Sequence, residues 1–439
     1  MKTSLAIGLL TVAVLPGAGF AADSLDAQID KLADQVEPHV IANRRYIHQH
    51  PELSNQEVET AKFVAEHLKQ LGIEVQTGVA KTGVIGVLKG GKPGPVVALR
   101  ADMDALPVTE EVDLPFKSTA RATFDGKEVG VMHACGHDAH TSMLLGAAEV
   151  IAQLKDQWPG TVKFIFQPAE ESPPYGEKGG GEEMVKEGVL SKDPKPEVIF
   201  GQHVLSEWAA GQVAYKPGAA MASADDFVVT VAGKGTHGAS PWRGVDPIVV
   251  AAQIVIGLQT IASRQMDVTK APVIVTVGKI EGGTRDNIIP DSVEMKGTLR
   301  SLDAGMRKEL QVRVKRTAEN IAEAAGARAN VVFGSHNHYP VTYNDLKLTA
   351  RMVPTLQRVA GDKNVSEVPA LMGAEDFSYF AEKIPGFYVF LGSRPPKEPK
   401  EGFPSNHSPR FRIDESVLKL GVKTITHLAA DYASGAGAH

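Results

Sequence analysis

The sequence predicts an α/β protein in which one domain is inserted into another. Apolar and β-branched runs alternate with stretches of helical periodicity along most of the chain. Between residues 224 and 334 the order becomes β-α-β-β-α-β, the ferredoxin-like unit, and further strands and helices follow it. A chain of 439 residues is also too long for one compact core. We therefore expect a main domain built from residues 22–223 and 335–439.

Residues 1–21 have the pattern of a secretory leader. A lysine precedes an apolar run at 6–15, and a proline, a glycine and small residues follow it. Ten residues are too few to span a bilayer, which needs about 20. A cut after Ala21 or Ala22 fits this pattern, and a buried N-terminal helix is the alternative. We expect a secreted protein, exported to a bacterial periplasm.

The composition favours a small-molecule substrate. The formal net charge is −6, and no dense run of lysine and arginine is present. Neither nucleic acid nor an anionic membrane is therefore an expected partner. The chain has one cysteine, Cys135, so it cannot form an internal disulfide.

The main domain is expected to begin with two helices, because apolar residues recur there at helical spacing. Its strands are short β-branched or apolar runs bounded by glycine and proline. The predicted helices are 25–50, 56–71, a helix to about 154 with Asp138 as a candidate N-cap, 182–188, 345–360, 375–382 and 414–432. The predicted strands are 73–75, 83–88, 95–101, 160–167, 198–204 and 386–391.

The inserted domain is expected to contain four strands and two helices in the ferredoxin-like order. Its predicted elements are strand 226–232, helix 246–263, strands 273–280 and 292–300, helix 304–325 and strand 329–333.

A metal-binding pattern precedes the helix that ends near residue 154. His133, Cys135, His137, Asp138 and His140 fall within eight residues. Imidazole, thiolate and carboxylate are the side chains that hold late transition metals. A polar loop that caps a helix is the alternative. One cysteine does not suit a structural zinc knuckle, so the pattern favours a catalytic metal site.

Further candidate ligands follow predicted strands. Asp102 and Asp104 have the spacing that places both on one face of a strand, where one could bind metal and the other orient a ligand histidine. Glu170 and Glu171 can share a site only if the preceding proline has turned the chain. His203 lies near the end of an apolar strand, where a packed core histidine is the more common interpretation.

Polar residues at strand ends and loops of the inserted domain are candidates for a lid. His237, Asn287 and Arg300 are of this kind, although each alone could be ordinary surface. Two polar clusters follow the insert, G-A-E-D-F at 373–377 and N-H-S-P at 406–409.

Together these motifs resemble the aminoacylase and carboxypeptidase-G family of dimetal peptidases, and within it the branch of hippurate hydrolases and indoleacetyl-amino-acid hydrolases. The resemblance covers essentially the whole chain after the leader. Seven motifs match in the family's order, at 100–106 (R-A-D-M-D-A-L), 133–140 (H-A-C-G-H-D-A-H), 167–171 (Q-P-A-E-E), 201–204, 235–241, 373–377 and 406–409. The fold it implies is a mixed-sheet catalytic domain of the zinc-peptidase type with an inserted ferredoxin-like lid and dimerisation domain.

The resemblance also implies roles for individual residues. Two divalent metal ions per subunit would be held by Cys135, His137, Glu171, His203 and His407. Glu170 would be the general acid and base. His237, contributed by a partner subunit of a dimer, would help to hold the oxyanion, while Asn287 and Arg300 would bind polar groups of the substrate.

The sequence departs from the wider family at one strand end. Most branches have His-x-Asp where this chain has Asp102-Met103-Asp104, and a bridging aspartate where it has Cys135. The resemblance implies that in this branch His137 compensates for the missing ligand. Asp102 and Asp104 are therefore expected not to bind metal, and Asp104 is expected to support a ligand residue. Thiolate favours zinc, while manganese, cobalt and nickel remain open.

The activity expected from this resemblance is metal-dependent cleavage of N-acyl amino acids to a carboxylic acid and a free amino acid. A dipeptidase or carboxypeptidase on the same fold is the nearer alternative. A periplasmic metal- or solute-binding protein without catalysis is the more distant one.

Overall fold

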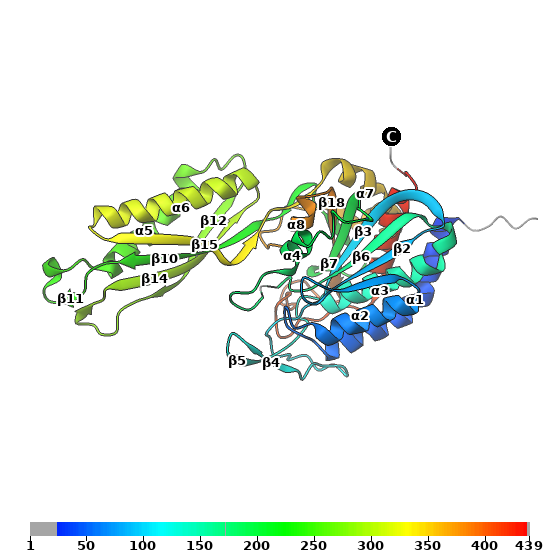
Figure 1. Ribbon diagram of the computed structural model, residues 1–439, viewed down its shortest axis with the longest axis horizontal. Coiled ribbons are helices and arrows are strands. Elements are labelled where there is room, and N and C mark those ends of the chain that lie inside the picture. The colour runs from blue at the N-terminus through cyan, green and yellow to red at the C-terminus, as the bar shows by residue number, and fades with distance from the viewer. Residues whose placement is uncertain (1–23, 172, 437–439) are drawn as a thin grey trace, which may run out of the picture.

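The computed structural model describes residues 24–171 and 173–436, and it has two lobes joined by extended strands (Figure 1). The leader predicted at 1–21 lies outside the described residues and stays a prediction. Chain segments 24–222 and 340–436 build the larger lobe, which carries both described termini.

The larger lobe is organised around a mixed eight-stranded sheet. Its central strands β6, β3, β7 and β18 are parallel; β2 pairs antiparallel with β6 on one side, and β8 pairs antiparallel with β18 on the other. In sheet order the strands are β1 (Glu74–Val79), β2 (Gly83–Lys89), β6 (Pro159–Gln167), β3 (Lys92–Asp102), β7 (Val198–Ala209), β18 (Gly386–Arg394), β8 (Val213–Tyr215) and β17 (Val365–Glu367).

Helices cover both faces of this sheet. One face packs against α1 (Leu25–Gln49), α2 (Val58–Gln70), α3 (His137–Gln153), α7 (Leu346–Ala360) and α9 (Ser416–Ala433). The other face packs against the short helices α4 (Gly180–Lys186) and α8 (Ser378–Ala381).

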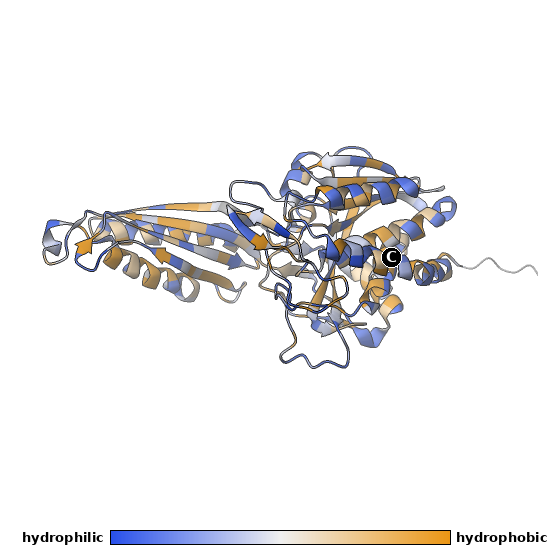
Figure 2. Ribbon diagram, turned by 90° about the horizontal axis from the view of Figure 1, so that it is seen from below, coloured by the Kyte–Doolittle hydropathy of each residue, from blue (hydrophilic) through white to orange (hydrophobic). Residues whose placement is uncertain are grey.

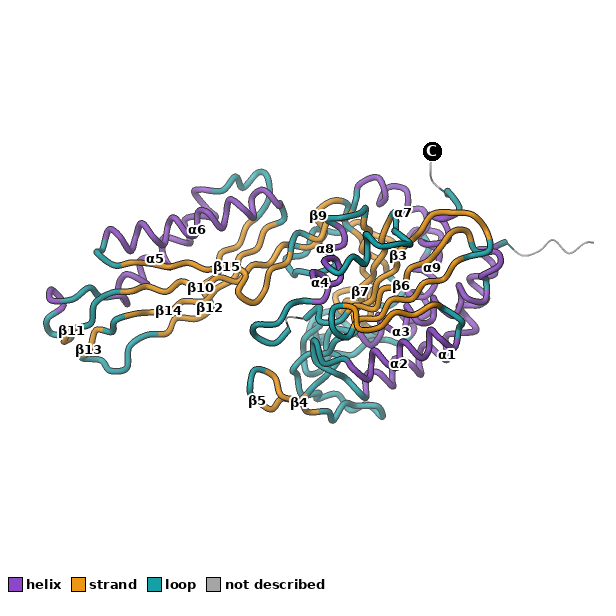
Figure 3. The backbone as a smooth tube through the Cα atoms, in the orientation of Figure 1, coloured by secondary structure: helices purple, strands orange, loops and turns teal. Residues whose placement is uncertain are grey.

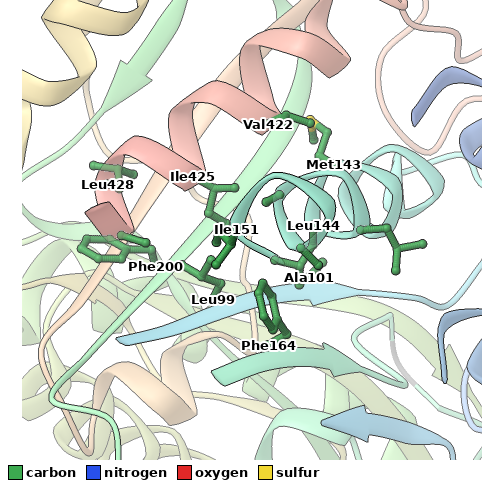
Figure 4. Packing of buried hydrophobic residues seen from close by; sticks show 14 of the residues in the cluster. Leu99, Ala101, Met143, Leu144, Ile151, Phe164, Phe200, Val422, Ile425 and Leu428 are labelled. Atoms are coloured by element: carbon green, nitrogen blue, oxygen red, sulfur yellow. The ribbon is translucent and has the colours of Figure 1, made fainter. Parts of the chain in front are cut away.

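The larger core forms where α3 and α9 lie on the central strands. Figure 4 shows Leu144 and Ile151 of α3 and Ile425 of α9 meeting Leu99 of β3 and Phe164 of β6. Each of these side chains is buried, so this face of the sheet is fixed by apolar packing. The packing holds the start of α3 against the ends of the central strands.

The second lobe contains a four-stranded antiparallel sheet in the order β12-β14-β10-β15, covered by two helices. The order of elements along the chain is the β-α-β-β-α-β order predicted from the sequence. The elements are β10 (Ser223–Ala232), α5 (Pro247–Thr260), β12 (Val273–Glu281), β14 (Ser292–Ser301), α6 (Ala304–Ala324) and β15 (Arg328–Tyr339). The boundaries at 223/224 and 334/335, and the roles of lid and dimerisation domain, stay predictions.

Helix α5 and the π-helical turn after it, together Pro247–Gln265, are by length and composition the one described span apolar enough to cross a membrane. This is weak evidence, since apolar helices that pack on a sheet pass the same test. The inner side of α5 packs Ile254 and Leu258 into the second core, whereas Val249 and Ile256 are exposed. Figure 2 shows hydrophobic colour along strands and helices of both lobes.

Several short elements were not predicted. They are the hairpin of β4 (Arg121–Phe124) and β5 (Lys127–Gly130), the pair of β9 (Gly218–Met221) and β16 (Thr342–Asn344), the tip pair of β11 (Thr236–His237) and β13 (Ile288–Ile289), and the three-residue strands β8 and β17. The candidate N-cap Asp138 was also wrong. Gly136 occupies that position, and Asp138 lies in the first turn of α3, where its carboxylate pairs with Arg44 at 2.7 Å.

Candidate functional site

A cavity of about 500 Å³ opens at the carboxyl ends of the central parallel strands, where ligands collect in open α/β sheets. Six of the residues predicted from the sequence line it: Cys135, Glu170, Glu171, His203, Arg300 and His407. They come from both halves of the larger lobe and, for Arg300, from the end of β14 in the second lobe. The structure therefore brings together residues that are far apart in the sequence.

Cys135 lies at the centre of the candidate metal ligands. Its Sγ is 3.3 Å from Nε2 of His203 and 3.2 Å from Nε2 of His407. Two groups of three potential ligand atoms share this thiol: Cys135 with His137 and His203, and Cys135 with Glu171 and His407. The thiolate of Cys135 would therefore be available to both groups of ligands if metal ions were bound.

A glycine turn places His137 at the start of α3. Gly136 has φ of +102°, and a Cβ there would lie 2.3 Å from Cγ2 of Val204. Glycine is required at this position because both the backbone angle and the close approach exclude a side chain. His137 is fully buried, with Nδ1 3.3 Å from Oδ1 of Asp104. Asp104 therefore lies behind the ring, and Nε2 is turned toward the candidate ligands.

The turn after β6 directs two neighbouring carboxylates into one cavity. Ala169 has φ of +49°, which breaks the alternation of an extended chain. The backbone N–H groups of Glu170 and Glu171 donate to the two oxygens of Asp104 at 3.0 and 2.9 Å. The side chain of Asp104 thus contacts the ring of His137 and the backbone N–H groups of Glu170 and Glu171.

Hydrogen bonds determine which ring nitrogen of His203 is free. Its Nδ1 lies 2.8 Å from the carbonyl oxygen of Val204, which can only accept, so Nδ1 carries the hydrogen. Nε2 keeps its lone pair and faces Cys135. His140, which is not in either of these two triads, supports this strand end because its Nε2 accepts the N–H of Val204 while Nδ1 donates to Asp102 at 2.6 Å.

Asn406 ties three segments around His407. Its Nδ2 donates to the carbonyl oxygens of Cys135 and Val204, and its Oδ1 accepts the N–H of Ser206. His407 has φ of +68°, a left-handed conformation that few residues other than glycine adopt, although histidine does so more readily than most. These bonds anchor the residue immediately before His407 to the segments of Cys135 and β7. The sequence identified this cluster as polar but not this role.

A buried arginine that sequence reasoning gave no role organises the floor of the site. Arg100 is 1% exposed, and its guanidinium contacts Asp102, Glu375 and Asp376 at 2.6 to 3.0 Å. A charged residue inside the apolar strand β3 must be paired with opposite charges. An arginine within an apolar strand was therefore the signal in the sequence that could have indicated this ion-pair network. Arg100 thus links Asp102, which accepts a hydrogen bond from His140, to Glu375 and Asp376 on the segment before α8.

Burial and like charges keep protons on the site in the absence of cations. Burial, together with Glu171 and Glu170, raises the pKa of the Cys135 thiol well above its usual range. Burial, together with Glu375 and Glu171, raises the pKa of Glu170 in the same way. Bound cations would reverse both effects, because positive charge favours thiolate and carboxylate.

The residues fit two divalent metal ions. Nε2 of His137 is buried and makes no hydrogen bond to any residue of 24–171 or 173–436. His137 lies at ligand spacing with Cys135 and His203 in one group and with Glu170 and Glu171 in another, while Cys135, Glu171 and His407 form a third group. A buried nitrogen without a partner is costly, and coordination by a metal would remove that cost. Sulfur and nitrogen ligands suit zinc and also permit manganese, cobalt or nickel.

Arg300 and an apolar wall line the rest of the cavity. The guanidinium of Arg300 makes no hydrogen bond or ion pair within the described ranges, although the residue is half-buried. Leu205, Met221, Leu371 and Met372 line the same cavity. The cavity therefore combines a free planar cation with aliphatic and thioether surface.

His237 and Asn287 do not line this cavity. They lie together at β11 and β13, where the N–H of Gly238 donates to the carbonyl oxygen of Asn287 at 2.8 Å. Figure 3 shows this pair of strands at the far tip of the second lobe, remote from β7 and β18. Within one chain, these two predicted site residues are therefore separated from the other predicted site residues.

The chain matches known proteins along nearly its whole length. Residues 98–431 match the model of peptidase family M20/M25/M40. Thermostable carboxypeptidase 1 of Saccharolobus solfataricus is 42% identical over 401 residues, covering 91% of this chain and 97% of that protein. IAA-amino acid hydrolase ILR1-like 2 of Arabidopsis thaliana is 39% identical, covering 89% and 84%.

A solved structure has the same fold. The YXEP protein of Bacillus subtilis, a dinuclear metal-binding peptidase of the M20 family, is 35% identical, with a TM-score of 0.73 over 91% of this chain and 99% of that one. The mixed α/β architecture, the ligand groups that share Cys135 and these matches agree. The chain belongs to the peptidase family M20/M25/M40, and it is a metal-dependent hydrolase of amide bonds that uses two divalent metal ions.

Proposed function

We propose that this enzyme hydrolyses N-acyl amino acids to a carboxylic acid and a free amino acid, and that it does so as a homodimer. The observation that supports the substrate class is the cavity itself. It holds the candidate metal ligands, the buried carboxyl of Glu170, the free guanidinium of Arg300 and an apolar wall. The metal ligands and Glu170 would act on the amide bond, Arg300 would bind the carboxylate, and the apolar wall would receive an apolar acyl group or side chain.

Arg300 would bind the substrate carboxylate. Its planar fork matches a carboxylate with two parallel hydrogen bonds, and no described side chain occupies it. The apolar wall of Leu205, Met221, Leu371 and Met372 would receive an apolar acyl group or side chain. This combination favours substrates with one charged end and one apolar end.

Glu170 would move the proton during hydrolysis. When bound, the two cations supply Lewis acidity, which lowers the pKa of water from about 15.7 toward about 7. The carboxylate of Glu170 would take a proton from the attacking water and return it to the amide nitrogen as that bond breaks. Glu170 is 5% exposed, so bulk water does not compete for this proton.

His237 would stabilise the oxyanion from a partner subunit. Its Nδ1 accepts the N–H of Ala239 at 3.0 Å, so the hydrogen of the neutral ring lies on Nε2, which can donate. Asn287 lies beside it and would enter the same site. The exposed apolar face of α5, with Ile248, Val249 and Ile256, offers a surface that a second copy can cover.

A carboxypeptidase or dipeptidase activity is the second candidate. The thermostable carboxypeptidase noted above supports it, and Arg300 would serve a peptide carboxylate equally well. The two activities differ in whether the residue before the scissile bond carries an acyl group or a free amine.

A substrate panel tests both candidates. N-acetyl, N-benzoyl and indoleacetyl amino acids and unblocked dipeptides are incubated with the metal-loaded protein, and the released amine is measured with and without chelator. Chelator-sensitive release from the acylated set is expected. Release from dipeptides alone would replace the proposal by the second candidate, and no release from any member would refute both.

A further inference from the structure

The turn at Ala169 decides whether Glu170 and Glu171 can act in one cavity. Adjacent residues of an extended chain face opposite ways, yet both carboxylates line the cavity. The left-handed φ of +49° at Ala169 makes this possible. Alanine disfavours that conformation, so the surrounding structure has to hold it.

Glu57 supplies the contact that holds it. This residue is 0% exposed, and its Oε1 accepts the backbone N–H of Ala169 at 2.8 Å and that of Asn55 at 2.9 Å. Its Oε2 lies 2.6 Å from Oγ1 of Thr82. The carboxyl is thus fixed at both oxygens and has one rotamer available to reach the turn.

Helix capping does not explain this buried carboxyl. Glu57 occupies the N-cap position of α2, but its side chain makes no capping hydrogen bond. Glu52 does that instead, because its carboxylate accepts the N–H groups of Glu59 and Thr60 at 3.1 and 2.8 Å. The side chain of Glu57 is turned away from its own helix and toward the turn after β6.

Glu57 and Asp104 together receive three successive backbone N–H groups, those of Ala169, Glu170 and Glu171. Burial and the charge of Asp104 raise the pKa of Glu57 to about 8, so it carries a proton at neutral pH. The hydroxyl of Thr82 donates to Oε2 of the carboxylate, and it can rotate to accept when Oε2 carries the proton. A glutamine can reproduce this neutral arrangement.

We propose that Glu57 is a positioning residue for the active site: it holds the left-handed turn at Ala169 and thereby aims Glu170 and Glu171 into the cavity. This inference rests on the proposed roles of those two residues in proton transfer and metal binding. Glu57 itself touches neither substrate nor metal.

The test compares Glu57→Ala with Glu57→Gln in the metal-loaded enzyme. Glu57→Ala is expected to lower kcat by about tenfold or more and to weaken metal affinity by about tenfold, because losing the support of a ligand typically has effects of this size. KM should change by less than about threefold, since Arg300 and the apolar wall lie on other segments. Glu57→Gln should keep at least about half of kcat.

Glu52→Ala is the matched control, because it removes a cap of the same helix without touching the turn. At an equal loss of Tm it should keep wild-type kcat and metal affinity. If Glu57→Ala does not fold, Glu57→Asp replaces it, since the shorter chain cannot reach both Ala169 and Thr82. Wild-type kcat and metal affinity in the Glu57 variant, or an equal loss in Glu52→Ala, would overturn the inference.

Metal affinity separates this inference from the proposed function. If the wild-type enzyme releases no amine from any substrate, the proposed function fails. A tenfold weaker metal affinity in Glu57→Ala but not in Glu52→Ala would still support the role of Glu57 in holding Glu171.

Discussion

Nε2 of His407 lies 3.2 Å from Sγ of Cys135, although 272 positions separate the two residues. Sγ of Cys135 also lies 3.3 Å from Nε2 of His203. The only thiol of the chain is therefore the point at which the two candidate ligand groups meet.

Replacing this thiol should remove both metals and not one. Cys135→Ala is expected to lower the metal content and the rate of hydrolysis together, because each ligand group loses its shared member. Metal analysis after desalting checks this. Ser142→Ala, in helix α3 shortly after Cys135, should keep both ions. Full stoichiometric metal in Cys135→Ala would show that the ligand assignment is wrong.

Arg300→Ala should raise KM for substrates with a free carboxylate. The loss of a charge-assisted pair of hydrogen bonds corresponds to about 2–3 kcal/mol, on the order of 30- to 160-fold in kcat/KM. For the same substrate with its carboxylate replaced by a carboxamide, kcat/KM should fall little in this variant, because Arg300 has no carboxylate to bind there. Arg328→Ala, an exposed arginine of β15, is the control. Equal losses on acid and amide would contradict carboxylate binding.

Mixing two inactive variants tests whether His237 acts in the partner's site. Glu170→Gln and His237→Ala should each have little activity alone. After subunit exchange, about a quarter of the wild-type rate is expected, because half of randomly paired dimers are mixed and each has one complete site. If His237 served its own chain, the mixture would stay inactive. Size-exclusion chromatography with light scattering establishes that dimers are present.

The pairing of Asp225 with Arg307 should make the protein sensitive to acid. Asp225 is 1% exposed, and Arg307 donates to its oxygens at 2.8 and 2.7 Å. Burial raises the pKa of Asp225. The hydrogen bonds from Arg307 and His338 outweigh this effect and leave the pKa of Asp225 below 3.8. The stabilisation is therefore present above pH 3.8 and is lost as pH falls through the folded value.

Tm measured between pH 7 and 3 checks this. Asp225→Ala should cost about 3 kcal/mol at pH 7, since it leaves a buried guanidinium unpaired. Wild-type Tm should fall more steeply below pH 4 than that of Asp225→Asn. Asp362→Asn, an exposed position, should follow the wild type. Parallel curves for the wild type and Asp225→Asn would contradict the assignment.

Local patterns predicted the helices and the central strands because their apolar spacing is set by packing on one sheet. The end of α3 and the strands around Leu99 and Phe164 follow this rule. The hairpin of β4 and β5 was missed because each strand has only four residues and packs on a small cluster apart from the main cores. Strands β8 and β17 were missed because three residues are too few to show a period.

The candidate site was only partly accessible from the sequence. Motifs and their order indicated the residues that the cavity brings together, whereas Glu57, Arg100 and Asn406 act through contacts between distant segments. Asp138 illustrates the limit, since a helix-start pattern predicted a cap where the fold uses a buried ion pair with Arg44. Contacts of this kind depend on the tertiary structure and leave no local periodicity.

The most direct test of the central claim measures hydrolysis and metal content together in Glu170→Gln. Glutamine has the shape of the native residue but cannot carry the proton. We expect two bound metal ions, as in the wild type, and release of free amino acid from N-acyl substrates slowed by about a thousandfold or more. A Glu170→Gln enzyme that releases amino acid at the wild-type rate would contradict the account.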